Sequence, residues 1–341
     1  MTAIGTSALA IDGGIPNVLA RVPEAVALLE QQGFAGCWTG ETNHDVFLPM
    51  VLAAEHTSRI RIGTDIAVAF ARNPMSIAQL GWDLQTYSQG RFVLGLGTQI
   101  RPHIENRFAM PWSRPVPRMR EFVAALHAIW ATWRDGEKLA FEGEFYTHKL
   151  MTPMFTPEPM PYPVPKVYLA AVGEAMTEMC GEVADGLLVH AFSTRRYLDE
   201  VAMPTLQRGL DRAGRKRSEM EVTSPVFVVT GRDEAEMAAV GAAVRQQIAF
   251  YGSTPAYRKV LDVHGWGDLQ TELRALSLQG EWETMASLID DDVLAAFAVV
   301  APVEEAAAAI KARCSGIIDR AMPMFGKADA ETVARVLTDL V

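Results

Sequence analysis

Residues 60–96 read IRIGTDIAVAFARNPMSIAQLGWDLQTYSQGRFVLGL, and this stretch contains the pattern that decides the fold. It begins and ends with short apolar runs typical of β-strands, Ile60–Ala69 and Arg91–Leu96. Between them, residues 74–88 carry apolar side chains at helical spacing. Two strands joined by a helix in this order are expected to lie parallel, connected by a right-handed crossover.

The same alternation continues in both directions from this stretch. Further strand patterns cover Thr6–Ile11, Gly36–Thr39, Lys166–Ala171, Gly186–His190, Val222–Thr230 and Gly316–Phe325. Helical patterns cover residues 48–58, 118–134, 173–184, 194–214, 233–250 and 328–340. A first helix is expected to begin at Pro16, after the turn Asp12-Gly13-Gly14. Eight strand–helix units are enough to close a (β/α)₈ TIM barrel, which we expect, and an open doubly wound sheet is the alternative.

Three stretches interrupt the alternation, at about residues 98–118, 136–165 and 252–315. The first two follow the fourth strand and the third follows the seventh strand. Residues 136–165 are rich in proline and aromatic residues, and a small hairpin is expected in LAFEGEFYTH. Because no Gly/Ser-rich linker or charge run separates these stretches, we expect a single domain over residues 1–341 with three insertions.

Composition excludes several classes of protein. The formal net charge is -10 and the pI is about 5.3, which argues against nucleic acid or an anionic membrane as a partner. The three cysteines form no CxxC pair, and no apolar stretch reaches membrane-spanning length, so we expect a cytoplasmic protein. No metal site is expected, and no GxSxG, P-loop or HExxH motif is present.

Candidate catalytic residues follow the second strand. In a βα barrel the reactive groups gather where strands end, because the following loops meet at a shared pocket. Here the segment TGETNHD places Glu41 and His44 close together, and a carboxylate beside an imidazole can orient a polar ring or move a proton. The alternative is a capping loop in which Asn43 or Asp45 serves the next helix.

Polar or small residues mark the ends of the next strands as well. Thr64 and Asp65 interrupt the apolar third strand, so Asp65 either points into the barrel mouth or is satisfied by backbone donors. The fourth strand ends in a Gly95-x-Gly97 turn that lacks the third glycine of a dinucleotide fingerprint. The basic residues that follow this turn either meet an anionic ligand or form a solvated face: Arg101, His103 and Arg107.

Four segments of the chain resemble one known superfamily: GFAGCWTGETNHD, TSRIRIGTDIAVAFARNPMSIAQ, LQTYSQGRFVLGLGTQ and PKVYLAAVGEAMTEMCGEVADGLLVH. Together they resemble the luciferase-like monooxygenase superfamily, and within it the coenzyme F420-dependent oxidoreductases. The resemblance runs over nearly the whole chain and implies a barrel whose mouth holds the ring of the cofactor. SQGRFVLGLGT and CGEVADG are its most specific parts.

The resemblance also implies roles for individual residues. Glu41 and Thr42 stand where relatives often have Asp-His against the deazaflavin ring, so His44, two residues later, departs from the pattern. The other positions implied to contact the cofactor are Thr64, Asp65 and Ile66 in a bulge that can contain a cis peptide, Gly97, Thr98 and Gln99 in a turn, Ala170, Ala171, Val172 and Gly173 in a wall, and His190, Ala191 and Ser193 in a phosphate-side loop. Gln99 lies near a position where relatives often carry an acidic glutamate, and the last loop lacks the lysine that some of them have.

Three functions are compatible with these observations. The first is hydride transfer between F420 and a small organic substrate, with Glu41 and His44 handling the proton. The second is an FMN-dependent monooxygenase supplied by a separate cofactor reductase. The third is a non-catalytic flavin-binding relative. In each case we expect a homodimer.

Overall fold

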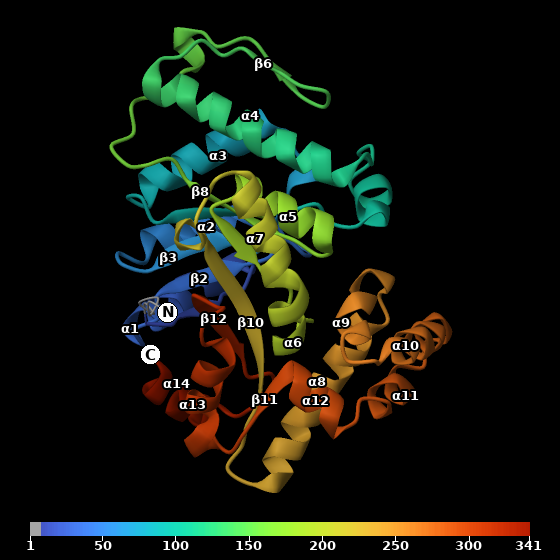
Figure 1. Cartoon of the computed structure of the whole chain (residues 1–341). Coiled ribbons are helices and arrows are strands. Elements are labelled where there is room, and N and C mark those ends of the chain that lie inside the picture. Colours follow the sequence, from blue (N-terminus) through green and yellow to red (C-terminus); the bar gives the residue numbers. More distant parts are fainter. Residues whose placement is uncertain (1–7) are drawn as a thin grey trace.

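The computed structural model describes residues 8–341, and its centre is a closed ring of eight parallel strands (Figure 1). Each strand pairs in parallel with the next, and the last pairs with the first. In chain order the strands are β1 (Ala10–Gly14), β2 (Gly36–Thr39), β3 (Arg61–Thr64), β5 (Phe92–Gly97), β8 (Lys166–Ala170), β9 (Gly186–Leu188), β10 (Glu221–Val229) and β12 (Arg320–Met324). The predicted barrel is confirmed, and the open sheet is excluded.

Helices surround the ring and bury the outer faces of the strands (Figure 1). In chain order they are α1 (Val22–Gln31), α2 (Phe47–Glu55), α3 (Pro74–Tyr87), α4 (Pro115–Asp135), α5 (Glu174–Val183), α6 (Arg195–Tyr197), α7 (Met203–Arg212), α8 (Glu234–Gly252), α13 (Val303–Cys314) and α14 (Ala330–Leu340). A π-helical turn, Leu198–Ala202, joins α6 to α7.

The predicted insertions follow the fourth and seventh strands of the ring. The two predicted stretches after the fourth strand lie on either side of α4, and the second of them contains the hairpin of β6 (Phe141–Glu142) and β7 (Thr147–His148), which pair antiparallel as expected. The carboxylate of Glu121 on α4 accepts backbone N–H groups from the turn of this hairpin. The other insertion extends to one side of the ring in Figure 1 and contains α9 (Arg258–Asp262), α10 (Gly267–Gln279), α11 (Trp282–Ser287) and α12 (Asp291–Phe297). A short strand that the sequence did not predict, β11 (Ala298–Val300), then pairs with β10.

The expected boundaries at the N-terminal end were wrong. The first strand was predicted as Thr6–Ile11, of which residues 6 and 7 lie outside the described residues. The strand instead runs through Asp12-Gly13-Gly14, because these residues pair with Gly36–Trp38 of β2. Pro16 does not begin a helix, since α1 starts at Val22 and has Pro23 in its first turn.

The third strand is divided rather than continuous. β3 ends at Thr64, the Asp65–Ile66 peptide bond is cis, and pairing resumes in β4 (Ala67–Val68) against β5. The Thr64 hydroxyl donates to the carbonyl of Gly95 at 2.7 Å and accepts the N–H of Gly95 at 2.9 Å, which ties β3 to β5 where the strand bends. Strands five and six also end earlier than expected, so Ala171 and His190 lie in loops.

Large and charged side chains fill the barrel interior below its carboxyl end. Asp12 and Arg320 form a buried ion pair, and Asp12 also accepts the indole N–H of Trp38 at 2.8 Å. Above this pair, Trp38 stacks on Tyr168 with 6.0 Å between ring centroids, and Val93 and Leu188 pack beside them. The interior is therefore closed from below, and a ligand must enter at the carboxyl ends of the strands.

Candidate functional site

The floor of the barrel mouth is apolar. Ile66, Ala170 and Met322 are partly buried on top of the Trp38–Leu188 layer. Gly97 lies directly against Ile66: a Cβ atom at Gly97 would come within 2.8 Å of the Ile66 Cδ1 atom. These small or aliphatic residues leave a surface on which a planar ring can lie.

The loop after β2 is held by a buried carboxylate. Glu41 accepts the N–H of Val68 at 2.8 Å and the Arg72 Nη1 group at 2.6 Å, and its own N–H donates to the Ile66 carbonyl at 3.1 Å. Arg72 also pairs with Asp45 at 3.0 Å. Glu41 therefore lies at the mouth with its charge balanced by Arg72, and it connects this loop to the bulge after β3.

The other side chains of this loop face solvent. Thr42 accepts a hydrogen bond from Asn17 at 2.9 Å, and His44 is exposed with no hydrogen bond recorded among residues 8–341. Asp45 accepts the N–H of Phe47 at 2.8 Å, so it serves the first turn of α2. The loop therefore has the capping role that the alternative interpretation gave it, and His44 remains free to meet a ligand.

Asp65 carries a half-buried carboxylate for which the described residues provide no hydrogen-bond donor or cation. The interpretation in which backbone donors satisfy it is therefore not supported. Loss of hydration raises the pKa of Asp65 to about 6. The side chain is largely surrounded by protein and still partly accessible to solvent.

The turn after β5 is held by local hydrogen bonds. Thr98 donates to the Gln99 carbonyl at 2.9 Å, and Gln99, with a φ of 59°, accepts the N–H of Ile100 through its side chain at 2.9 Å. Of the basic residues that follow, Arg101 pairs with Glu105, and Arg107 donates to the carbonyl of Thr42. Arg107 thus joins this insertion to the β2 loop.

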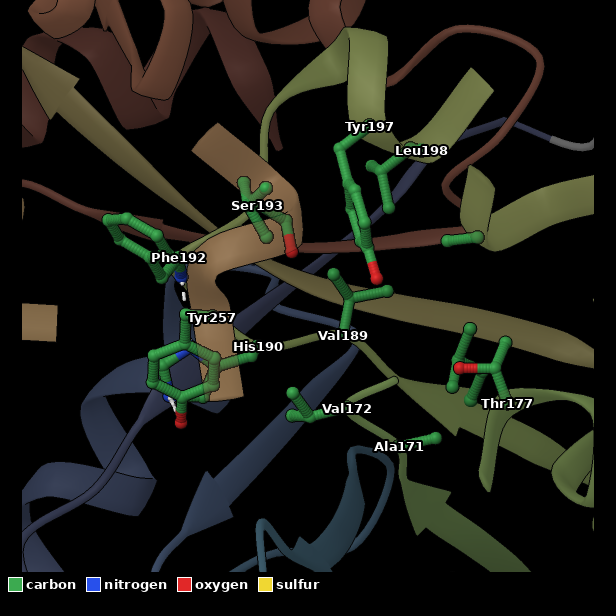
Figure 2. A pocket seen from close by; sticks show the side chains of 13 residues that line it. Ala171, Val172, Thr177, Val189, His190, Phe192, Ser193, Tyr197, Leu198 and Tyr257 are labelled. Carbon is green, nitrogen blue, oxygen red and sulfur yellow. Dashed lines mark hydrogen bonds between the residues drawn. The ribbon is translucent and has the colours of Figure 1, made fainter. Parts of the chain in front are cut away.

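A small pocket that is partly open to solvent lies beyond the ends of β8 and β9 (Figure 2). Four of the predicted cofactor residues line it together: Ala171, Val172, His190 and Ser193. The neighbouring Gly173, with a φ of 86°, precedes the first turn of α5. The pocket has no charged side chain in its lining, which consists of aliphatic residues, Phe192, His190 and four residues with a hydroxyl group: Thr177, Ser193, Tyr197 and Tyr257.

Two tyrosines that sequence reasoning missed complete this pocket. Tyr197 is buried, and Figure 2 shows its hydroxyl between Val189 and Thr177. Tyr257 stacks on His190 with 4.5 Å between ring centroids and an interplanar angle of 25°. Because the tyrosines come from α6 and from the insertion after α8, no local motif marked them.

His190 makes two hydrogen bonds through its ring. Its Nδ1 atom accepts the N–H of Phe192 at 3.1 Å, and its Nε2 atom lies 3.1 Å from the Tyr257 hydroxyl. Burial lowers the pKa of His190 to about 4, so the ring is neutral near pH 7.

Among residues 8–341, no group of three or more His, Cys, Asp or Glu side chains is arranged to hold a metal ion. In the same part of the chain, no helix is both long and apolar enough to span a bilayer.

The sequence pattern of the luciferase-like monooxygenase family matches residues 3–320. The chain belongs to this family. An uncharacterised protein of Mycobacterium tuberculosis (strain ATCC 25618 / H37Rv) is 64% identical to this luciferase-like protein over 98% of each chain. The 5,10-methylenetetrahydromethanopterin reductase of Methanolobus tindarius is 26% identical over 88% of this chain and 87% of that protein.

A solved structure has the same fold. The coenzyme F420-dependent tetrahydromethanopterin reductase from Methanopyrus kandleri superposes on the luciferase-like chain with a TM-score of 0.78, at 20% identity, covering 98% of each chain. The superposition confirms the luciferase-like barrel. Relatives in this family are oxidoreductases or monooxygenases.

Proposed function

We propose that this luciferase-like protein is an oxidoreductase that transfers a hydride between coenzyme F420 and a small organic substrate. The observation that carries the proposal is the apolar floor of Ile66 and Gly97, with the unpaired carboxylate of Asp65 directly before Ile66 in the chain. A planar redox ring needs such a floor, and a hydride transfer to or from carbon needs a nearby group that holds or releases a proton. The names of the reductases that this chain resembles support the same reaction class.

The residues at the mouth fit a deazaflavin cofactor. When bound, F420 supplies a ring carbon that accepts or donates the hydride. Ile66, Gly97 and Ala170 would support the ring, and Thr64 would keep the bulge attached to β5. The free N–H groups at the start of α5, after Gly173, would receive a phosphate. The remaining predicted contacts are Thr42, Thr98, Gln99, Ala171, Val172, His190, Ala191 and Ser193.

Asp65 is the best-placed proton-handling group in this proposal. Glu41 already balances Arg72, whereas the Asp65 carboxylate has no such partner among the described residues. Because the pKa of Asp65 is raised to about 6, its oxygen can exchange a proton with a ligand near neutral pH. Glu41 and His44, which the sequence indicated for this task, stay predictions.

Titration of the purified protein with F420 and with FMN tests the proposal directly. We expect F420 to bind at least tenfold more tightly than FMN, followed by fluorescence of each cofactor. Tighter FMN binding would favour a two-component monooxygenase with a separate reductase as its partner. Tight binding without turnover of any reduced cofactor would favour a non-catalytic relative. Homodimer formation stays a prediction, to be checked by light scattering.

Replacing Gly97 by valine is expected to weaken F420 binding by about tenfold or more. The new side chain would displace Ile66, since a Cβ atom at residue 97 already lies within 2.8 Å of the Ile66 Cδ1 atom. Fluorescence titration measures the change. The control is Gly316→Ala. An added Cβ atom at Gly316 meets nothing within 4 Å, so this change tests only the effect of a side chain on a backbone whose φ is 76°. Unchanged affinity in Gly97→Val would place the cofactor elsewhere.

Replacing Glu41 by glutamine is expected to lower turnover by a factor on the order of 10² while the protein stays folded. The neutral side chain no longer balances the charge of Arg72, while the backbone bond from residue 41 to the Ile66 carbonyl stays in place. His44→Ala is expected to have an effect of similar size. Steady-state rates and circular dichroism measure both, and wild-type rates in either variant would remove that residue from the mechanism.

A further inference from the structure

The protonation state of His190 follows from its contacts. A backbone N–H group can only donate, so the Nδ1 atom that receives the Phe192 N–H carries no proton. The pKa of the ring is lowered to about 4 by burial, so the imidazole is neutral near pH 7. A neutral imidazole has one N–H, which must then be on Nε2.

This tautomer decides the direction of the next hydrogen bond. The Nε2–H group of His190 donates to the hydroxyl oxygen of Tyr257 at 3.1 Å, and Figure 2 draws both bonds of the imidazole as dashed lines. The hydroxyl proton of Tyr257 is therefore not used in this bond, and the described residues offer it no other acceptor. Burial raises the pKa of Tyr257 to about 12, so the phenol keeps this proton.

His190 and Tyr257 both line the pocket beyond the ends of β8 and β9. Tyr257 is stacked on the imidazole, and Phe192 packs against Tyr257 with 5.7 Å between centroids. These contacts fix the ring plane and hence the direction of the free O–H group.

We propose that the Tyr257 hydroxyl donates a hydrogen bond to the oxygen of an uncharged carbonyl group on a ligand in this pocket, with His190 as its positioning residue. The inference deepens the proposed function, on which it rests for the identity of the reaction. A carbonyl group, which has no formal charge, fits because no charged side chain lines this pocket. The carbonyl belongs either to a ketone or aldehyde substrate or to the cofactor ring, and the two are distinguished below.

The variant Tyr257→Phe removes only the hydroxyl, and Tyr251→Phe is its matched control. Tyr251 packs edge-on against the same imidazole at 4.8 Å but has no hydrogen bond to it. Binding of cyclohexanone and of methylenecyclohexane, which differ by the carbonyl oxygen, is measured by NMR titration with and without saturating F420. We expect the wild type and Tyr251→Phe to prefer the ketone, and Tyr257→Phe to lose about three- to tenfold of that preference.

The affinity for F420 itself distinguishes the two possible acceptors. If Tyr257→Phe weakens F420 binding while Tyr251→Phe does not, the acceptor is a carbonyl of the cofactor. If only the ketone preference falls, the acceptor belongs to the substrate. Either result supports the donor role, and a Tyr257→Phe protein unchanged in both measurements overturns it.

A third measurement does not depend on any ligand. Nitrogen NMR of ¹⁵N-histidine protein, assigned with the variant His190→Gln, is expected to show the Nε2–H tautomer of His190 from pH 5.5 to pH 8. An Nδ1–H tautomer would overturn the inference. If F420 fails to bind, the proposed function fails, while the tautomer and the cofactor-free ketone titration still decide this inference.

Discussion

Replacing Asp65 by asparagine is expected to stabilise the folded protein at pH 8 and to lower its activity. Loss of hydration raises the pKa of this carboxyl from 3.8 to about 6, so the folded state disfavours its charged form. The stabilising contribution of the neutral acid is fully present below about pH 4 and is lost as the pH rises through 6. Above that range the ionised Asp65 lowers the free energy of unfolding by about 1–3 kcal/mol, given the partial exposure of the group.

Urea denaturation at pH 4.5 and pH 8 measures this effect. Wild type and Asp65→Asn should have similar stabilities at pH 4.5, and the variant should be more stable at pH 8. The control is Asp268→Asn, at an exposed residue on α10. It should change the free energy of unfolding far less at both pH values. A variant that is less stable than the wild type at pH 8 would show that Asp65 has a favourable partner when ionised.

The activity of Asp65→Asn should fall by a factor on the order of 10², because the amide cannot exchange a proton. If Asp65 is the proton-handling group, the wild-type profile of kcat/KM should have a limb near pH 6 that disappears in the variant. A gain in stability together with a loss of turnover is typical of a residue kept for function. Retention of the limb near pH 6 would assign the proton to another residue, with His44 the first to be examined.

Much of the barrel could be predicted because its signal is local. Each strand–helix unit has its pattern within a short stretch of sequence, as in Ile60–Ala69 and residues 74–88. Parallel strands are buried on both faces, so each one has a nearly continuous run of apolar residues. Closure of the ring was inferred from the count of units and from the resemblance. Pairing of β1 with β12, far apart in the sequence, has no local signature.

The parts that escaped prediction depend on residues distant in the sequence. The balance of Glu41 by Arg72 joins two loops 31 residues apart, and the contact of His190 with Tyr257 joins segments 67 residues apart. The end of β3 at Thr64 reflects the side-chain bond to Gly95, which a strand pattern alone does not reveal. The sequence could therefore indicate Glu41 and His190, while the partners that define their chemistry, Arg72 and Tyr257, came only from the fold.

Replacing Asp12 by alanine is expected to cost about 3–5 kcal/mol of unfolding free energy. Asp12 is fully buried and accepts bonds from Arg320 at 2.5 and 2.8 Å and from the Trp38 indole at 2.8 Å. Without it, the buried guanidinium of Arg320 has no counter-charge, because the neighbouring Glu221 is already bound to Arg61 and Tyr168. Urea denaturation at pH 7 measures the loss.

Two further variants separate the buried charge from other causes of this loss. Glu304→Ala removes the acid of an exposed pair with Arg335 and should cost no more than about 1 kcal/mol. The double variant Asp12→Leu/Arg320→Met removes both charges and should recover most of the lost stability, since the cost lies in an unpaired ion rather than in the absence of a salt bridge. If Asp12→Ala costs no more than Glu304→Ala, Arg320 finds water or another partner, and the barrel is not closed from below as the pair implies.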